Sequence, residues 1–421
     1  MAKVVVLGAN GAMGAGSGET FAAAGIRTVF LARTRDKARQ GVARAIKMAK
    51  SEAVARLITV GSYEEDLARE VADADLVFEA VAEDLETKRD IFAAVDAARR
   101  PDAIVATVSS GLSIAAMAGG RSDGFARAFL GIHLFNPPNV IVGCEVIPHA
   151  GTDPEVTAFV IGWLEGALGR QVIRTSDTPA FCGNRVGFKV LNEVAQLAAE
   201  HPPAWLDALV GPHTGRAMPP LATIDFVGWD VHAAIVDNLH ASTRDEAHRN
   251  FALPDYMRTL IAAGHLGAKT PDKGGFFRKE LALAPGNGSY QVPAPRPLPE
   301  FVGRIKQLHR VGRYREALAV MAEATGAEAE LMRRVVLGYV SYGLNRVGEV
   351  VESAADVDRI MGYGFNWAPP SVLVDLLGAR RTVALLEAAR LPVPSVIADA
   401  AAGGTPLFTD GDVDPGRFFF A

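Results

Sequence analysis

A glycine-rich segment near the start of the sequence has the residue types and spacing to bind a phosphate group. Gly8, Gly11 and Gly14 follow the apolar run Val4–Leu7 and lead into an alanine-rich stretch. Glycines in a strand-to-helix turn let backbone amides approach a pyrophosphate at the helix N-terminus. The spacing GxxGxxG is one residue longer than the usual GxGxxG, but a strand before it and a helix after it strengthen the interpretation. We therefore predict a dinucleotide site that includes these glycines and Met13; the alternative is a tight turn without a ligand.

The residues after the second expected strand indicate which dinucleotide is bound. In NAD-specific folds this strand ends in Asp or Glu, which holds the ribose hydroxyls. Here Arg33 and Arg35 follow the strand, with Lys37 close behind. Guanidinium groups bind a 2′-phosphate through charge-assisted hydrogen bonds. The sequence therefore favours NADP, and the alternative is a set of solvated charges at the start of a helix.

Short apolar runs alternate with helical stretches over the first 148 residues or so. This alternation predicts a parallel sheet with helices packed on it, and so a Rossmann-like, doubly wound domain over residues 1–178. The expected strands are Val4–Leu7, Thr28–Leu31, Leu76–Glu79, Ile104–Thr107 and Ala128–His133. The expected helices are Ala12–Ala24, Arg35–Lys50 and Leu85–Arg99.

Helical patterns dominate the rest of the chain, and they predict two further domains, residues 179–295 and 296–421. A segment rich in proline, glycine and polar residues, Lys279–Pro299, predicts a linker between them. The two domains look like diverged copies of each other. Asn192, Asp207 and Asp225–Gly228 in the first correspond to Asn345, Asp358 and Asp375–Gly378 in the second. The expected fold is α/β followed by two related all-α domains; chance recurrence of the Asp-to-Gly pattern is the alternative.

Composition narrows the class of protein. The 421 residues are 49% hydrophobic with a formal net charge of −5, which gives no basic field for a nucleic-acid partner. The apolar run at the N-terminus ends at Gly8, too soon for a signal peptide or a membrane span. The two cysteines, Cys144 and Cys182, form no CxxC pair, and no histidine cluster has metal-ligand spacing. We expect a cytoplasmic protein without a metal site.

Five ordered segments resemble the 3-hydroxyacyl-CoA dehydrogenase family. They are Asp75–Leu85 with Lys88 behind it, Gly131–Pro137, Glu145 twelve residues after His133, Pro179–Arg185, and Gly264–Thr270 with Gly274–Phe277 behind it. The second of these, Gly-Ile-His-Leu-Phe-Asn-Pro, is similar to the family's H-F-F-N-P segment. The resemblance covers about residues 3–280, and more loosely 330–390. It implies a Rossmann domain followed by helical domains.

The resemblance also implies roles for particular residues. His133 would be the general base on the 3-hydroxyl of an acyl-CoA, and Glu145 would orient its ring. Ser110 and Asn184 match positions near the substrate oxygen and the thioester carbonyl, with a turn hydroxyl and a helix N-cap as alternatives. The cofactor, which is NAD by the family resemblance, would also contact Glu83 and Lys88. The chain departs from the family where Val108 replaces an Asn and where Val142 replaces a Lys, which weakens the expected contacts to CoA or nicotinamide.

The expected activity is therefore hydride transfer between NAD(P) and the 3-hydroxyl or 3-keto group of an acyl-CoA, in fatty-acid β-oxidation or its reversal. A dehydrogenase of a free hydroxy acid and a dinucleotide-binding module without turnover are the alternatives. The second alternative is weakened by the His133 and Glu145 pair, because a sensor needs no base. We expect a monomer or homodimer in which the second helical domain imitates a dimer partner.

Overall fold

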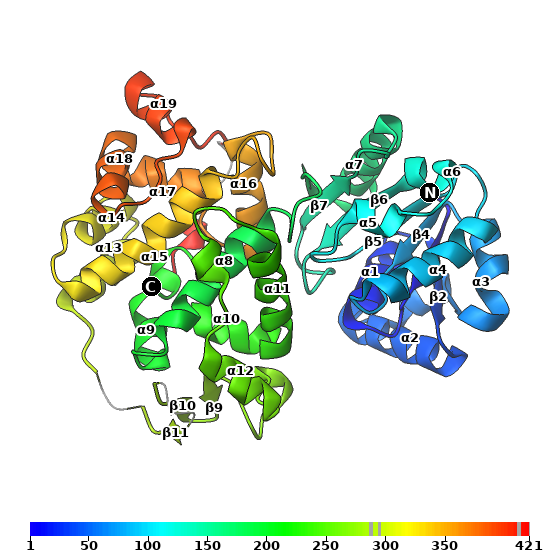
Figure 1. Ribbon diagram of the computed structural model, residues 1–421, viewed down its shortest axis with the longest axis horizontal. Helices are drawn as coiled ribbons and strands as arrows, with labels where there is room; N and C mark the ends of the chain where they lie inside the picture. The colour runs from blue at the N-terminus through cyan, green and yellow to red at the C-terminus, as the bar shows by residue number, and fades with distance from the viewer. Residues whose placement is uncertain (286–288, 294–295, 411–413, 421) are drawn as a thin grey trace. The chain divides into compact units, whose positions relative to one another are not determined.

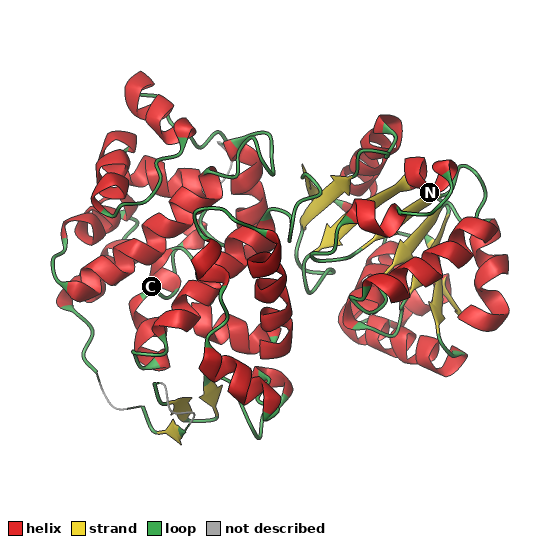
Figure 2. Ribbon diagram, viewed as in Figure 1, coloured by secondary structure: helices red, strands yellow, loops and turns green. Residues whose placement is uncertain are grey.

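The computed structural model describes residues 1–285, 289–293, 296–410 and 414–420 (Figure 1). The chain divides into two compact units, Met1–Phe181 and Cys182–Ala421. The first unit is a sheet with helices and the second is mainly helical, which confirms the expected fold class (Figure 2). The first unit ends three residues beyond the expected boundary at 178, and both helical segments belong to a single unit.

An eight-stranded sheet forms the centre of the first unit. Its strands are β1 (Lys3–Leu7), β2 (Arg27–Ala32), β3 (Ile58–Ser62), β4 (Leu76–Glu79), β5 (Ile104–Thr107), β6 (Phe129–Leu134), β7 (Gly143–Pro148) and β8 (Gln171–Arg174). The order is β3-β2-β1-β4-β5-β6-β7-β8. The strands from β3 to β6 are parallel to their neighbours, as in a Rossmann sheet, whereas β7 is antiparallel to β6. The sequence analysis missed β3, β7 and β8, whose apolar runs are short.

Helices cover both faces of this sheet. One face packs against α1 (Ala12–Ala23), α2 (Arg35–Ala49) and α7 (Pro154–Leu168). The other packs against α3 (Tyr63–Ala72), α4 (Leu85–Ala98), α5 (Ile114–Ala118) and α6 (Asp123–Ala128). Short polar residues fix several helix starts: the side chains of Thr34, Ser62 and Asp84 each accept a hydrogen bond from an amide in the following turn.

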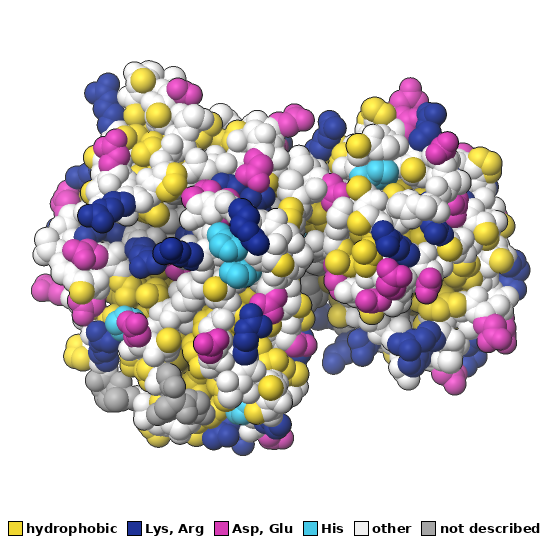
Figure 3. All heavy atoms as spheres, viewed as in Figure 1, with side chains coloured by type: hydrophobic (Ala, Val, Ile, Leu, Met, Phe, Trp, Pro, Cys, Tyr) yellow, Lys and Arg dark blue, Asp and Glu magenta, His cyan; other side chains and the backbone are white. Residues whose placement is uncertain are grey.

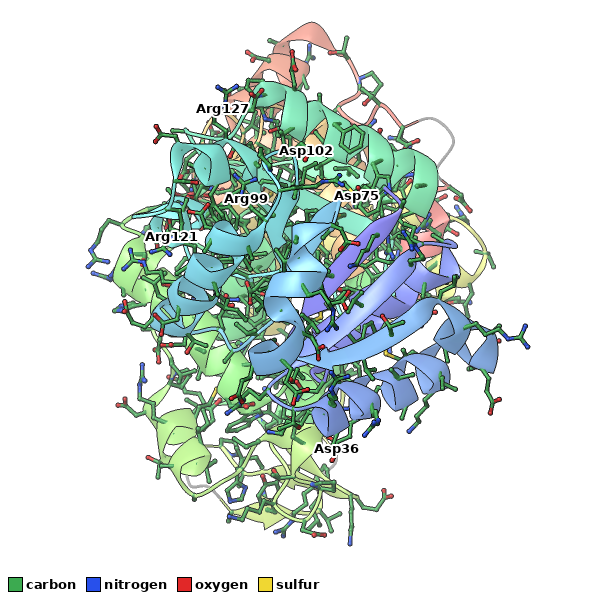
Figure 4. The ribbon with its side chains drawn as sticks, turned by 90° about the vertical axis from the view of Figure 1, so that its right-hand side faces the viewer. Asp36, Asp75, Arg99, Asp102, Arg121 and Arg127 are labelled. Carbon is green, nitrogen blue, oxygen red and sulfur yellow. The ribbon has the colours of Figure 1, made fainter. Side chains whose placement is uncertain are left out.

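The two ends of the sheet have different roles. In Figure 4, Asp75 and Asp36 are labelled at opposite ends of the α/β unit. Asp75 precedes β4 and accepts hydrogen bonds from the backbone of Lys3 and from Arg100, so it ties the amino ends of β1 and β4 together. Asp36 follows β2 at the carboxyl ends of the parallel strands, where open α/β sheets bind their ligands.

The second unit contains two successions of helices. The first is α8 (Gly183–Leu197), α9 (Pro203–Leu209), α10 (Pro220–Val227), α11 (Trp229–Ser242) and α12 (Asp255–Ala262). A small sheet of β9 (Phe277–Arg278), β10 (Leu281–Leu283) and β11 (Tyr290–Gln291) follows. The second succession is α13 (Glu300–Arg310), α14 (Tyr314–Glu323), α15 (Ala327–Leu344), α16 (Ala354–Ile360), α17 (Pro370–Leu377), α18 (Ala379–Ala388) and α19 (Ser395–Gly403). The expected linker therefore contains two strands; residues 286–288 and 294–295 of it lie outside the described part.

Matching hydrogen bonds support the duplication of the helical region. Asp225 in α10 accepts bonds from the amides of Phe276 and Phe277, and Asp375 in α17 accepts bonds from the amides of Leu407 and Phe408. Gly228 and Gly378 end these helices with positive φ angles of 101° and 89°. We define the helices α8–α12 as the first copy and α15–α19 as the second copy.

The pairing of Asn192 with Asn345 was wrong. Asn192 binds the carbonyl of Ala252, three residues before α12, whereas Asn345 lies at the end of α15 and binds the carbonyl of Ser341. It is Ser341 that binds the corresponding carbonyl, that of Pro392, three residues before α19. Ser341 is therefore the counterpart of Asn192, and the shared identity of the two asparagines was coincidental.

Candidate active site

His133 and Glu145 form a buried pair on neighbouring strands. The register of β6 and β7 places them directly opposite each other, with His133 Nδ1 2.7 Å from Glu145 Oε2. Their side chains are 3% and 0% exposed. The rings of Phe135 and Phe181 lie 4.7 and 5.7 Å from the imidazole, centroid to centroid. A carboxylate on Nδ1 favours the tautomer with the proton there, which leaves Nε2 as the nitrogen that can accept a proton from a substrate.

The glycine-rich turn is shaped for close approach of backbone to ligand. Gly8 has a φ of 77°, and a Cβ atom there would lie 2.2 Å from the carbonyl oxygen of Ala80. A Cβ at Gly14 would lie 2.4 Å from the carbonyl oxygen of Gly8. Gly11 is the N-cap of α1 and supplies no capping side chain, and Met13 is half-buried in the first turn. The uncapped helix start fits a pyrophosphate, which backbone amides and the helix dipole would hold.

Tyr63 holds this turn in place and was missed by the sequence analysis. Its hydroxyl accepts a hydrogen bond of 2.8 Å from the amide of Gly8. Burial raises the pKa of Tyr63 to about 12, so the hydroxyl stays neutral. The residue lies 55 positions after Gly8, and no local motif connects them.

Arg33 and Arg35 have different surroundings. Arg33 is exposed directly after β2 and makes no ion pair with a described residue. Arg35 pairs with Glu65 at 3.0 Å and with Asp66, whose side chain is 1% exposed, at 2.8 Å. Arg35 thus connects the start of α2 to α3, and Arg33 is the residue whose charge is available to a ligand.

Glu83 and Lys88 lie together beyond the carboxyl end of β4. The ammonium of Lys88 is buried and binds both carboxylate oxygens of Glu79, at 2.8 and 2.9 Å. It lies 3.4 Å from Glu83, which accepts hydrogen bonds from the hydroxyl of Ser109 at 2.5 Å and the amide of Ser110 at 2.9 Å. The structure therefore brings three of the expected site residues, Glu83, Lys88 and Ser110, to one edge of the sheet.

Glu79 is a second residue that the sequence analysis did not assign. Besides holding Lys88, it accepts a 2.6 Å hydrogen bond from the hydroxyl of Thr107 at the end of β5. A glutamate at the end of an otherwise apolar strand was the available signal, because a buried carboxylate requires partners.

Asn184 belongs to the second unit, near the start of α8. The side chain is buried, and the N-cap of α8 is Cys182, which makes no side-chain capping bond. The alternative role as an N-cap was therefore wrong. Ala180 and Phe181, just before the N-cap of this helix, have positive φ angles of 58° and 54°.

The part of the chain that the structure describes contains no group of three or more His, Cys, Asp or Glu side chains placed to hold a metal ion. Cys144 and Cys182 are both buried, and neither is part of a disulfide. None of the described helices combines the length and apolar character needed to cross a bilayer. Acidic and basic side chains are interspersed on the face shown in Figure 3.

Comparison with known proteins identifies the family. The NAD binding domain of 3-hydroxyacyl-CoA dehydrogenase matches residues 3–178, and the C-terminal domain of that enzyme matches residues 181–276. A probable 3-hydroxyacyl-CoA dehydrogenase of Deinococcus radiodurans is 35% identical over 66% of this chain and 82% of its own length. The chain belongs to the 3-hydroxyacyl-CoA dehydrogenase family. This membership makes it an oxidoreductase with a nicotinamide-dinucleotide domain.

Other members of the dehydrogenase family cover different shares of the chain. A probable 3-hydroxyacyl-CoA dehydrogenase of Bacillus subtilis is 30% identical over 83% of this chain but only 45% of its own length, so this chain spans less than half of that relative. The crystal structure of M. tuberculosis FadB2 is 28% identical with a TM-score of 0.59, over 66% of this chain and 99% of its own. A 3-hydroxybutyryl-CoA dehydrogenase of Escherichia coli shares the fold over 96% of this chain and 99% of its own, with a TM-score of 0.72 at 21% identity.

The two departures from the dehydrogenase family's motifs lie in different environments. Val108 is buried, and its amide donates to the carbonyl of Glu79. Val142 is 40% exposed, one residue before β7. An exposed valine in place of a lysine removes a charge that could have bound an anionic group of the substrate.

Proposed function

We propose that this chain transfers hydride between NAD(P) and the 3-hydroxyl or 3-keto carbon of an acyl-CoA, with His133 as the general base. The observation that carries the proposal is the 2.7 Å contact between His133 Nδ1 and Glu145 Oε2 on adjacent buried strands. In the oxidation, the hydroxyl proton passes to His133 Nε2 as hydride leaves the carbon. Bound NAD(P) supplies the acceptor for that hydride. Glu145 stabilises the resulting imidazolium, and in the reverse reaction the same proton returns to the product.

Ser110 and Asn184 have proposed roles that rest on the match to the family's motifs. The amide of Ser110 binds Glu83, which fixes the backbone at this position. We assign Ser110 to the substrate oxygen and Asn184 to the thioester carbonyl, on the match to the family's motifs. Their side chains would position the substrate and would not exchange protons with it.

The proposed cofactor is NADP. Arg33 follows β2 at the place where NAD-specific folds carry an acidic residue, and it has no acidic partner among the described residues. A 2′-phosphate would supply that partner. We propose fatty-acid β-oxidation or its reversal as the setting, in the cytoplasm, with a monomer or homodimer as the assembly.

A steady-state assay of the full chain tests the proposal. Oxidation of NADPH and of NADH is followed with acetoacetyl-CoA and, separately, with acetoacetate as substrate. The proposal expects at least tenfold higher kcat/KM for the thioester. Equal or greater kcat/KM for acetoacetate would instead support a dehydrogenase of a free hydroxy acid, the second candidate, which the valine at position 142 favours.

A further inference from the structure

The two helical copies differ at the loop that follows their last helix. In the first copy, a loop from His265 to Gly275 separates α12 from Phe276. Lys269 of this loop pairs with Asp230 in the first turn of α11, at 2.7 Å. The side chain of Lys269 lies so close to Gly228 that a Cβ atom there would be 2.5 Å from it. The loop therefore covers the start of α11 with a paired charge.

In the second copy only a few residues make the same connection. Thr405 and Pro406 lie between Gly404, which ends α19, and Leu407. The residues after this shorter connection still bind the counterpart of Asp225. Asp375 accepts hydrogen bonds from the amides of Leu407 and Phe408. The second copy thus lacks the segment that covers the helix start in the first, while the matching carboxylate and its two backbone bonds are present.

The missing segment leaves a cleft of about 380 Å³ in the second copy. Its walls come from α14, α17, α18 and α19, which lie together in Figure 1. Gly378 and Gly404 line this cleft, and a Cβ atom at either position would meet no other atom within 4 Å. The space beside both glycines is therefore open. A volume of this size is within the range of small-molecule sites.

The cleft is lined by arginine where the first copy has an acidic residue. Counting from the glycines that end α10 and α17, Arg380 takes the place of Asp230. Arg380 and Arg315 each donate to a backbone carbonyl, those of Ala401 and Asp375. Neither forms an ion pair with a described residue, so each guanidinium is held in position while its charge remains unneutralised.

The other charges of the cleft are already engaged. Arg381 pairs with Glu323 at 2.6 Å, and both carboxylate oxygens of Asp375 accept backbone bonds. Apart from Thr405, the remaining lining consists of glycine and apolar residues, Ala379, Ala400 and Pro406 among them. The cleft therefore offers two guanidinium groups that have no ionic partner among the described residues, beside a small apolar wall.

We propose that this cleft binds an organic phosphate, with its phosphate on Arg315 and Arg380 and its apolar body against α19. Arginine is suited to this role because its planar guanidinium pairs with phosphate oxygens in a fixed geometry. The site belongs to the second copy alone, since Lys269 and Asp230 fill the same place in the first. It does not depend on the proposed dehydrogenase activity.

Amide hydrogen exchange of the full chain, with adenosine 3′,5′-bisphosphate as the probe, tests the proposal. Because exchange is read peptide by peptide, protection at residues 376–383 and 398–406 is separated from any binding at the Arg33 site. The double variant Arg315→Gln/Arg380→Gln removes both free charges. Arg304→Gln in α13 is the matched control, because Arg304 is exposed and does not line the cleft.

The proposal expects the probe to protect both peptides, the apparent Kd to rise at least tenfold in the double variant, and no change in the control. Inorganic pyrophosphate, which lacks an apolar body, should protect the same peptides more weakly. The proposal would be overturned if these peptides showed no protection at a probe concentration of about 1 mM, which is the weak end of specific binding. Protection that persists in the double variant would also overturn it. So would an equal loss of protection in the control variant, which would indicate unspecific attraction of the probe to basic side chains.

Discussion

The side chain of Lys189 in α8 packs against Gly338 of α15, so that a Cβ atom at Gly338 would lie 2.8 Å from the lysine ammonium. Because Asn192 and Ser341 are counterparts, Lys189 and Gly338, each three residues earlier, are counterparts too. On either side of this contact, Arg185 binds Tyr342 and Glu193 binds Arg334. The two copies thus contact each other where the equivalent positions 189 and 338 face each other. The first copy has a lysine at this position and the second copy has a glycine.

This asymmetry bears on what happens when the second helical region is removed. A chain ending at residue 295 would expose the buried face of α8, and pairing two such chains in the same register would place Lys189 against Lys189. We therefore expect the truncated chain to self-associate irregularly or aggregate rather than form a stable dimer. Sedimentation of the intact and truncated chains measures this. In the intact chain, Gly338→Lys should lower the free energy of unfolding by on the order of 3 kcal/mol, because the added side chain would overlap the ammonium of Lys189 and bury a second ammonium beside one carboxylate, that of Glu193. A soluble, monomeric truncated chain of full stability and activity would show that the second copy does not replace a dimer partner.

Replacement of His133 by Gln should reduce kcat by about 10²–10⁴-fold, the usual contribution of a general base, with little change in cofactor affinity. Turnover and the Kd of NADPH are the two measurements. Glu145→Gln keeps the shape of the partner and removes its charge, so it should also lower kcat. The two residues act as a pair, and the double variant should therefore lose less than the product of the single losses. A His133→Gln enzyme with more than a tenth of the wild-type turnover would eliminate His133 as the base.

Arg33→Asp should weaken NADPH binding at least tenfold and improve the use of NADH, because a carboxylate repels a 2′-phosphate and accepts bonds from ribose hydroxyls. The ratio of kcat/KM for the two cofactors is the measurement. Arg35→Gln is the matched control: its guanidinium pairs with Glu65 and the buried Asp66, so its loss should lower stability and leave the ratio unchanged. A wild-type enzyme that prefers NADH tenfold or more would contradict the role of Arg33.

The sequence allowed the sheet and much of the site to be predicted, because their signals are local. The strands β1, β2, β4 and β5 were found within a residue at each end, and the glycine turn was recognised from its spacing. Contacts between residues far apart in the sequence could not be predicted. Tyr63 reaches Gly8 across 55 residues, and Arg35 turned out to bind Asp66 across 31, since which side chains meet is decided by packing rather than by local pattern. The repeat was visible in Asp225 and Asp375, but a shared asparagine led to a wrong alignment of α8 with α15.

The last prediction concerns His309, a buried histidine in α13. It is 4% exposed, its ring lies 4.7 Å from that of Phe419, and neither ring nitrogen has a hydrogen-bond partner among the described residues. Burial lowers the pKa of His309 to about 4, from an ordinary value of 6.5. In this pH range the His309 side chain is protonated in the unfolded chain but neutral in the folded chain. His309 therefore lowers the free energy of unfolding as the pH decreases from about 6.5 towards 4.

His309→Phe should stabilise the protein by about 1–2 kcal/mol at pH 7, because an apolar ring of similar size leaves no unsatisfied nitrogen. The gain should grow as the pH is lowered through this window, since position 309 then has no group to protonate. Urea unfolding at several pH values between 7 and 4.5 measures both effects. His201→Phe, at a half-buried position outside α13, is the control for replacing a histidine by an apolar ring. If His309→Phe gains nothing at pH 7 and keeps the wild-type slope with pH, the buried nitrogens must be hydrated or paired in solution.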